Sequence, residues 1–204
     1  MSAPDDAAEA EQFTEEQDDF FASCVESSDS LVGHVSTVEA ARDMDVLRGA
    51  LREENLAYLG FSYGTTLGGV YAELFADNVG RFVLDAATDP ELDFRENSLS
   101  QARGFQTALN AYVDDCLAGG SCFLGADRQE GLDTIKTLLD DIEASPLPTS
   151  SGRDLAIGNA FYGVVTPLYS RDNWPFLDQA LQEGLAGKGD TLLLLSDFYS
   201  SRNA

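Results

Sequence analysis

The residues best suited to chemistry lie in the stretch Gly60-Phe61-Ser62-Tyr63-Gly64, which has the spacing G-x-S-x-G. An apolar run precedes this stretch and a helical pattern follows it, an arrangement that predicts a sharp turn from a strand into a helix. The flanking glycines avoid the clashes that a Cβ atom would cause in such a turn. We expect the Ser62 hydroxyl to be displayed as a nucleophile and the Tyr63 N–H to stabilise an oxyanion. The alternative is a glycine-rich turn without chemistry.

A nucleophilic serine needs a neighbouring base, and the sequence offers poor candidates for one. The single histidine, His34, precedes Ser62, and we expect it to be a solvated loop residue and not the base. Asp85 ends the apolar run after the helix, where some hydrolases hold their acid, but without a histidine it has nothing to orient. We expect Asp85 to support loops at the strand end, and Asp89 to form the turn before Pro90.

The elements that would position the serine follow from hydrophobic periodicity. Ser36 and Glu39 have the spacing of a capping box, and behind them runs the apolar stripe of a helix, namely Val38, Ala41, Met44, Leu47 and Leu51. Short apolar runs at 55–60 and 81–85 predict strands, and a second stripe lies between them. Helix, strand, helix and strand at this spacing predict a parallel sheet with a right-handed crossover.

The second half of the chain has a different pattern of apolar residues. Apolar residues recur at helical spacing from residue 105 to 142, and the pattern resumes near 161–168 and 176–185 after the break "SPLPTSSG". No convincing strand pattern lies between Pro90 and Asp190. We therefore expect a helical unit in this half.

The composition limits the function classes. The 204 residues include 36 acidic and 12 basic side chains, for a formal net charge of −24, so binding to nucleic acid or to anionic membrane surfaces is not expected. The longest aliphatic run, Leu192 to Leu195, is far too short to span a membrane. The aspartate pairs lack calcium-loop spacing, and we expect neither a metal ion nor a cofactor.

The N-terminal region is acidic and polar. Residues 1–12 lack the basic and apolar regions of a signal peptide and read as a disordered tail, and a polar loop is expected at 13–33. Among the cysteines, Cys116 and Cys122 bracket the short loop "LAGGS", which a disulfide could close, and Cys24 is left over. Free buried thiols are the alternative for this pair.

The segments "ARDMDVLR", "GFSYGTTLGGVYA", "VLDAATDP" and "DDCLAGGSCFLG" together resemble the tripeptidyl-aminopeptidase branch of the α/β-hydrolases, which are prolyl-aminopeptidase-like serine peptidases. The resemblance implies the α/β-hydrolase fold, with a partial core at 13–90, a helical cap at 91–190 and a return toward the core at 191–204. It also implies Ser62 as nucleophile, the Tyr63 N–H as oxyanion donor, and a Cys116–Cys122 disulfide in a family whose members are usually exported.

The resemblance further implies an aminopeptidase that releases short peptides or proline from a peptide substrate with a free N-terminus. The family's other oxyanion loop, its acid and its histidine have no counterparts in this chain, so we expect the chain to be inactive alone and to bind the missing parts of its own fold. A degenerate, non-catalytic binding module and an esterase on the same scaffold are the alternatives.

Overall fold

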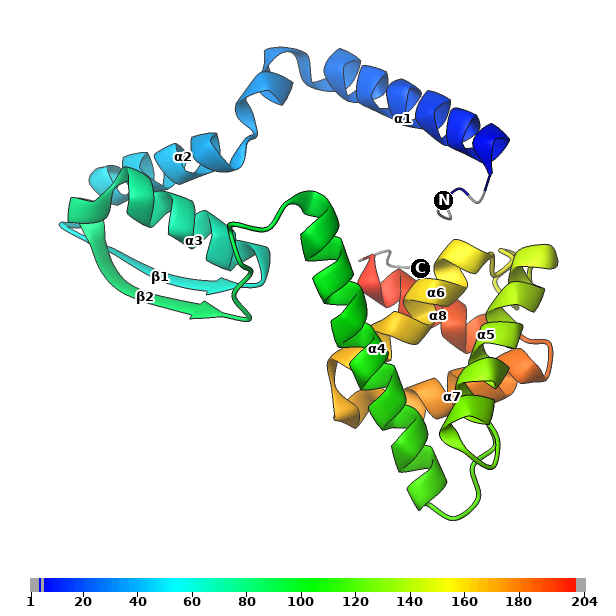
Figure 1. Cartoon of the computed structure of the whole chain (residues 1–204). Coiled ribbons are helices and arrows are strands. Elements are labelled where there is room, and N and C mark those ends of the chain that lie inside the picture. Colours follow the sequence, from blue (N-terminus) through cyan, green and yellow to red (C-terminus); the bar gives the residue numbers. More distant parts are fainter. Residues whose placement is uncertain (1–3, 5, 201–204) are drawn as a thin grey trace. The chain divides into compact units, whose positions relative to one another are not determined.

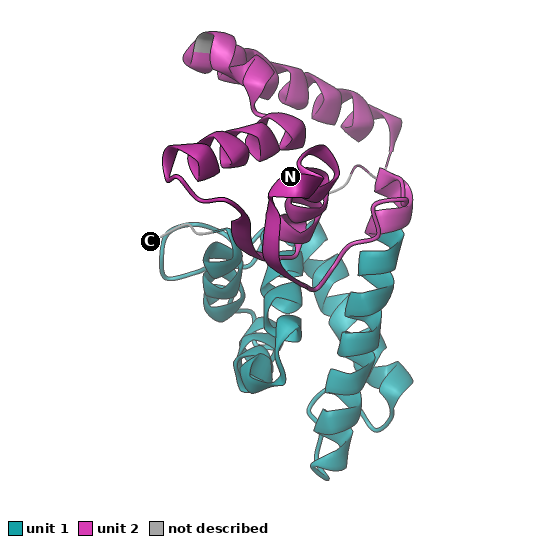
Figure 2. Ribbon diagram, turned by 90° about the vertical axis from the view of Figure 1, so that its left-hand side faces the viewer, with its two compact units in different colours: residues 1–3, 99–204 teal, residues 4–98 magenta. Residues whose placement is uncertain are grey.

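The structure, a computed structural model, describes residue 4 and residues 6–200, apart from the side chain of Asp29 (Figure 1). The described residues divide after residue 98 into two compact units, which we call the sheet unit and the helical unit (Figure 2). Helix α4 (Phe94–Ala118) begins in the sheet unit and continues in the helical unit. No helix in the described ranges combines the length and the apolar character that a membrane span requires.

The sheet unit contains the predicted alternation of helices and strands, namely α2 (Thr37–Ala50), β1 (Leu56–Phe61), α3 (Tyr63–Leu74) and β2 (Val79–Asp85). The two strands pair in parallel, with the residues of β1 opposite those of β2 up to the pair Phe61 and Asp85. A strand, a crossover helix and a parallel strand confirm the predicted α/β class. Both observed strands lie within two residues of their predicted bounds.

Helix α2 begins where the capping pattern predicted. The Ser36 hydroxyl accepts a hydrogen bond from the Glu39 N–H, at 3.2 Å, which satisfies one of the donors that a helix N-terminus leaves free. The Glu39 carboxylate binds Arg42 at 2.6 Å. Of the two hydrogen bonds of the predicted capping box, the structure therefore shows the one to the Ser36 hydroxyl, while the Glu39 carboxylate pairs with Arg42.

A polar hub at Asp45 fastens α2 to α3 and to the short 3-10 turn η2 (Ala76–Asn78). Its Oδ1 atom accepts hydrogen bonds from Arg48 Nε at 2.7 Å, Asn78 Nδ2 at 2.8 Å and the Tyr71 hydroxyl at 3.0 Å. The bond from Arg48, followed by those from Asn78 and Tyr71, holds the pKa of the Asp45 carboxyl at about 2, against partial desolvation. Three elements around the crossover therefore depend on one carboxylate.

One face of the two-stranded sheet is apolar and open. Tyr58 and Phe82 point toward α3, where the Phe82 ring contacts that of Tyr71. The alternate residues point to the opposite face, where Leu59, Phe61 and Val83 are each 58–59% exposed. Parallel sheets are normally covered on both faces, so this surface lacks the partner that its composition favours.

The N-terminal expectations differ from the structure. Residues 7–12 were expected in a disordered tail and 13–33 in a loop, yet helix α1 (Ala7–Ser28) and the 3-10 turn η1 (Asp29–His34) occupy this region. Residues 1–3 and 5 lie outside the described residues. The Asp6 carboxylate accepts from the N–H groups of Ala8 and Glu9, and alanine, glutamate and glutamine that follow favour a helix. Acidity alone was therefore a poor guide.

The helical unit is built from the remainder of α4 and from four further helices, α5 (Arg128–Ala144), α6 (Ile157–Val165), α7 (Trp174–Leu185) and α8 (Asp190–Tyr199), with the 3-10 turns η3 (Thr166–Tyr169) and η4 (Arg171–Asn173). Their apolar faces meet in one core that includes Tyr112, Ile142, Leu177 and Leu192. The extended pairing in the described part of this unit is a single bridge between Leu147 and Leu155. The helical character predicted for this half is confirmed.

The expected return toward the sheet at 191–204 differs from the structure. Residues 190–199 form α8, which packs on α6 inside the helical unit, and Leu192 and Leu193 are buried there. A Cβ atom at Gly163 of α6 would lie 2.4 Å from the Leu192 carbonyl oxygen, so glycine permits this close approach. Residues 201–204 lie outside the described part. A leucine-rich run after a polar turn served here as a core helix.

Two cross-links join segments of the helical unit. Cys116 and Cys122 form a disulfide, as the resemblance implied, and Cys24 of α1 is a free thiol. The Arg153 guanidinium binds both carboxylate oxygens of Asp197, at 2.7 and 3.1 Å, and the Asp197 side chain is only 10% exposed. The bidentate pair ties the loop after α5 to α8.

We expect Asp45→Asn to lower the melting temperature of the sheet unit at pH 6 but not at pH 2. The folded-state pKa of Asp45 is about 2, below its ordinary value of 3.8, so the ionised carboxylate stabilises the fold above about pH 4 and that stabilisation is lost as the pH falls through 2. Circular-dichroism melts of both proteins between pH 2 and 6 measure the difference. The exposed Asp43→Asn on the same helix is the control, and a pH-independent gap would contradict the assignment.

We expect the open sheet face to drive self-association of the isolated chain. Replacing Leu59 and Val83 together by threonine keeps β-branched or strand-compatible side chains while removing apolar surface. Sedimentation velocity should then show a larger monomer fraction, whereas the equally conservative Val46→Thr on α2 should leave association unchanged. A monodisperse wild-type monomer with a sharp two-state melt would refute this expectation.

Candidate active site

Ser62 occupies the turn between β1 and α3 in a strained conformation. Its φ of 51° and ψ of −119° lie in a region that residues with a Cβ atom rarely adopt, at a cost of order 1–3 kcal/mol. Ser62 is the N-cap residue of α3, yet its hydroxyl makes no capping hydrogen bond. Ser62 is exposed, and its hydroxyl is not used to cap the helix.

Close packing around Tyr58 requires glycine at position 60 and leaves little room for a side chain at position 64. A Cβ atom at Gly60 would lie 2.5 Å from the Gly64 carbonyl oxygen and 2.6 Å from the Tyr58 ring, and one at Gly64 would lie 3.2 Å from the Tyr58 hydroxyl. That hydroxyl donates to the Gly64 carbonyl at 2.7 Å. The strand thus holds the first turn of α3 through one tyrosine, which the sequence analysis did not identify.

Three threonines, which the sequence analysis also missed, hold the turn from the other side. The buried Thr65 donates both its N–H, at 2.8 Å, and its hydroxyl, at 2.7 Å, to the Ser62 carbonyl. The Thr88 N–H donates to the Thr65 hydroxyl at 3.3 Å, and the hydroxyls of Thr66 and Thr88 lie 2.8 Å apart. A threonine pair in the first turn of a helix was the available signal, because such hydroxyls bond nearby carbonyls.

Tyr63 is the first residue of α3, so its N–H has no acceptor within the helix. The N-terminal end of the helix also carries a partial positive charge, which favours an anion beside this N–H. The Tyr63 side chain is 57% exposed, and its hydroxyl lies 2.8 Å from Thr37 Oγ1 at the start of α2. The hydrogen bond between these two hydroxyls links the Tyr63 side chain to α2.

Asp85 and Asp89, which were expected to be structural, each accept a hydrogen bond from a backbone N–H, Asp85 through its main-chain carbonyl and Asp89 through its carboxylate. Asp85 ends β2, and its carbonyl accepts the Ser62 N–H at 3.1 Å, which joins the serine to the neighbouring strand. The Asp89 carboxylate accepts from the Glu91 N–H at 3.0 Å, as in a turn. Neither contact gives these residues a catalytic role.

A base beside the serine is missing from the described site. His34 is the last residue of η1, and within the described ranges no hydrogen bond reaches the Ser62 hydroxyl from it or from any other side chain. The described residues also contain no group of three histidine, cysteine or acidic side chains arranged to hold a metal ion. The described site therefore holds an exposed serine hydroxyl beside a helix N-terminus, without a hydrogen-bonded base.

A family model described as the α/β hydrolase fold matches residues 14–184. The chain is 38% identical over 193 residues to the serine protease Hip1 of Mycobacterium tuberculosis, which covers 91% of this chain and 37% of that protein. It is 40% identical over 178 residues to carboxylesterase B of the same species, covering 86% and 34%. It is 40% identical over 110 residues to tripeptidyl aminopeptidase of Streptomyces lividans, covering 52% and 20%. The chain thus spans about a third of the length of the first two relatives.

We expect Gly60→Ala to destabilise the sheet unit by about 1–3 kcal/mol, because the added methyl group would collide with the Gly64 backbone. The matched control is Gly69→Ala in the middle of α3, where a Cβ atom meets open space and should stabilise the helix by about 0.5–1 kcal/mol. Urea unfolding measures both changes. Equal effects at the two positions would contradict the packing described for the turn.

Proposed function

Because the chain belongs to the α/β-hydrolase fold family, we propose that it carries the nucleophile of a serine peptidase that forms an acyl-enzyme on Ser62. The observation that carries the proposal is the strained, exposed serine whose hydroxyl takes no part in capping α3. Its oxygen would attack the substrate carbonyl, the Tyr63 N–H would stabilise the oxyanion, and the bond to the leaving amine would break. The histidine that accepts and returns the proton would come from outside the described site.

The proposed substrate is a peptide with a free N-terminus, from which the enzyme releases a short peptide or proline. Two relatives named as a serine protease and a tripeptidyl aminopeptidase support a peptidase. The net charge of −24 supports attraction of a substrate that carries a positive α-amino group. An extracytoplasmic location is proposed as well, because the Cys116–Cys122 disulfide is typical of oxidising compartments.

An esterase is the second candidate, and the specific observation in its favour is the 40% identity to carboxylesterase B. The turn at Ser62 suits peptide and ester hydrolysis alike, since both reactions pass through an acyl-serine and a tetrahedral oxyanion. The ratio of kcat/KM for a tripeptide anilide to that for a short-chain ester distinguishes the two. A non-catalytic binding module is the third candidate, which any Ser62-dependent turnover would exclude.

We expect the purified 204-residue chain to release no anilide from a chromogenic tripeptide or prolyl substrate above the level of its Ser62→Ala variant. Loss of the base from a serine triad lowers turnover by about 10⁶, and the one histidine here makes no contact with the serine. Turnover that vanishes in Ser62→Ala would contradict the proposed inactivity of the chain alone.

The positive arm of this test is a chimera in which the chain replaces the matching segment of serine protease Hip1. We expect tripeptide anilide hydrolysis that Ser62→Ala abolishes and that the exposed Ser100→Ala preserves. Circular dichroism establishes that each chimera is folded. Activity that survives Ser62→Ala in a folded chimera would refute Ser62 as the nucleophile.

A further inference from the structure

A groove of about 630 Å³ runs along one face of α5, within the helical unit. The C-terminal end of α7 and the loop after α5 form its other wall. Its floor is apolar and comes from Leu138 and Ile142 of α5, from Leu147 and from Leu185, which is 47% exposed. Leu138 and Ile142 are buried, so the exposed apolar surface of the groove comes from Leu147 and Leu185. A groove of this volume lies within the range of ligand-binding clefts.

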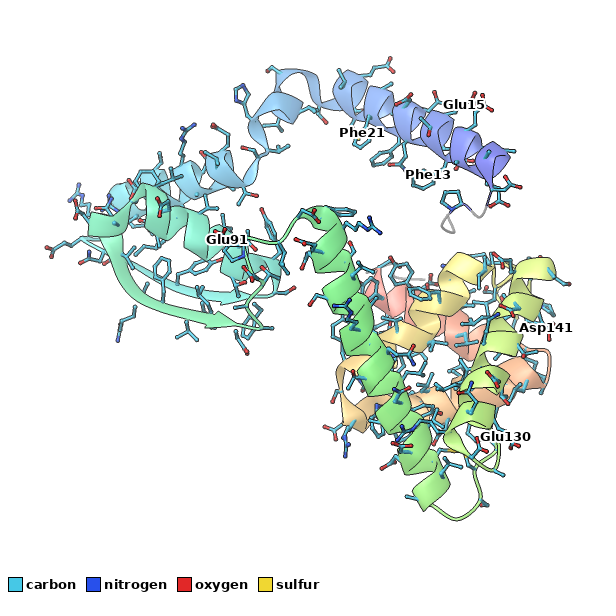
Figure 3. All side chains as sticks on the ribbon, in the orientation of Figure 1. Phe13, Glu15, Phe21, Glu91, Glu130 and Asp141 are labelled. Carbon is cyan, nitrogen blue, oxygen red and sulfur yellow. A yellow bond between two sulfur atoms is a disulfide. The ribbon has the colours of Figure 1, made fainter. Side chains whose placement is uncertain are left out.

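Three carboxylates line the same groove. Glu130, Asp133 and Asp141 are exposed and share one face of α5, with Glu130 near its beginning and Asp141 near its end (Figure 3). The helical rise places the first and last about 16 Å apart along the axis. In the described part of the chain, none of the three forms an ion pair with lysine or arginine.

The neighbouring charges of α5 show that this lack of partners is local. Lys136 pairs with Asp140 one helical turn along, and neither residue lines the groove. The Glu130 carboxylate is held in place by the Ala126 N–H at 2.8 Å, which leaves its charge at the mouth of the groove. The groove therefore combines an apolar floor with the carboxylates of Glu130 and Asp141, neither of which forms an ion pair within the described residues.

We propose that this groove binds a peptide segment in which two basic side chains flank apolar ones. Apolar residues would cover the leucine and isoleucine floor, and the basic side chains would meet Glu130 and Asp141 at its two ends. An extended chain rises about 3.3 Å per residue and its side chains alternate between two faces, so two basic residues about six positions apart, roughly 20 Å, share a face with alternate apolar residues and span the distance between the two carboxylates. The proposal does not depend on Ser62 or on hydrolysis.

The probe is a fluorescent heptapeptide, Arg-Ala-Leu-Ala-Leu-Ala-Arg, with a blocked N-terminus and an amidated C-terminus, titrated with the whole chain and followed by anisotropy. Blocked ends exclude recognition of a free α-amino group. We expect saturable binding that weakens about threefold with Asp141→Asn and about threefold with Glu130→Gln, which keeps the acceptor for the Ala126 N–H. Asp140→Asn removes an equal charge from the same helix outside the groove and should leave the affinity unchanged.

The floor is tested separately. Leu185→Ser should weaken binding about tenfold, with an unchanged circular-dichroism spectrum, and replacing both peptide leucines by serine should do the same. Absence of saturable binding, or equal weakening by Asp140→Asn, would overturn the proposal in favour of general attraction to an acidic surface. Self-association of the chain that Leu185→Ser abolishes, without peptide binding, would assign the groove to a second copy and would also overturn it.

Discussion

A serine held at φ 51° and ψ −119° has no intrinsic preference for that conformation, so its neighbours must maintain it. The elements around the turn do so through backbone contacts. The Asp85 carbonyl accepts from the Ser62 N–H, and Thr65 donates to the Ser62 carbonyl. The Tyr58 hydroxyl donates to the Gly64 carbonyl in the first turn of α3. Each of these contacts engages the main chain, and no described residue forms a hydrogen bond with the Ser62 hydroxyl.

The two units are stabilised by different means. In the sheet unit, the Asp45 carboxylate collects three donors from α2, α3 and η2, and apolar residues on one sheet face remain exposed. In the helical unit, an apolar core, a disulfide and the partly buried Arg153–Asp197 pair join its segments. Polar stabilisation depends on pH and on one ionised group, whereas apolar burial is spread over many side chains.

The acidic character of the chain acts at two scales. A net charge of −24 creates a long-range field that repels anions and attracts cations, and this field is screened within about 10 Å at ordinary salt. Short-range selectivity requires carboxylates beside apolar surface, as Glu130 and Asp141 are along α5, where the Ala126 N–H holds the Glu130 carboxylate. The amino-acid composition therefore accounts for a general attraction of cations, whereas selective binding depends on how individual side chains are arranged.

The sequence by itself determined the strand-to-helix turn at Ser62, the parallel strand pair, the helix cap at Ser36 and the helical second half, because these depend on local spacing and periodicity. It failed for residues 7–33 and 191–199, where helices formed in place of a tail and loop or a return to the sheet. Only the tertiary structure decided the roles of Tyr58 and Asp45 and the groove on α5. Those features join residues that are distant in sequence or on different elements, and a side chain's partner is set by how the elements pack, which no local pattern encodes.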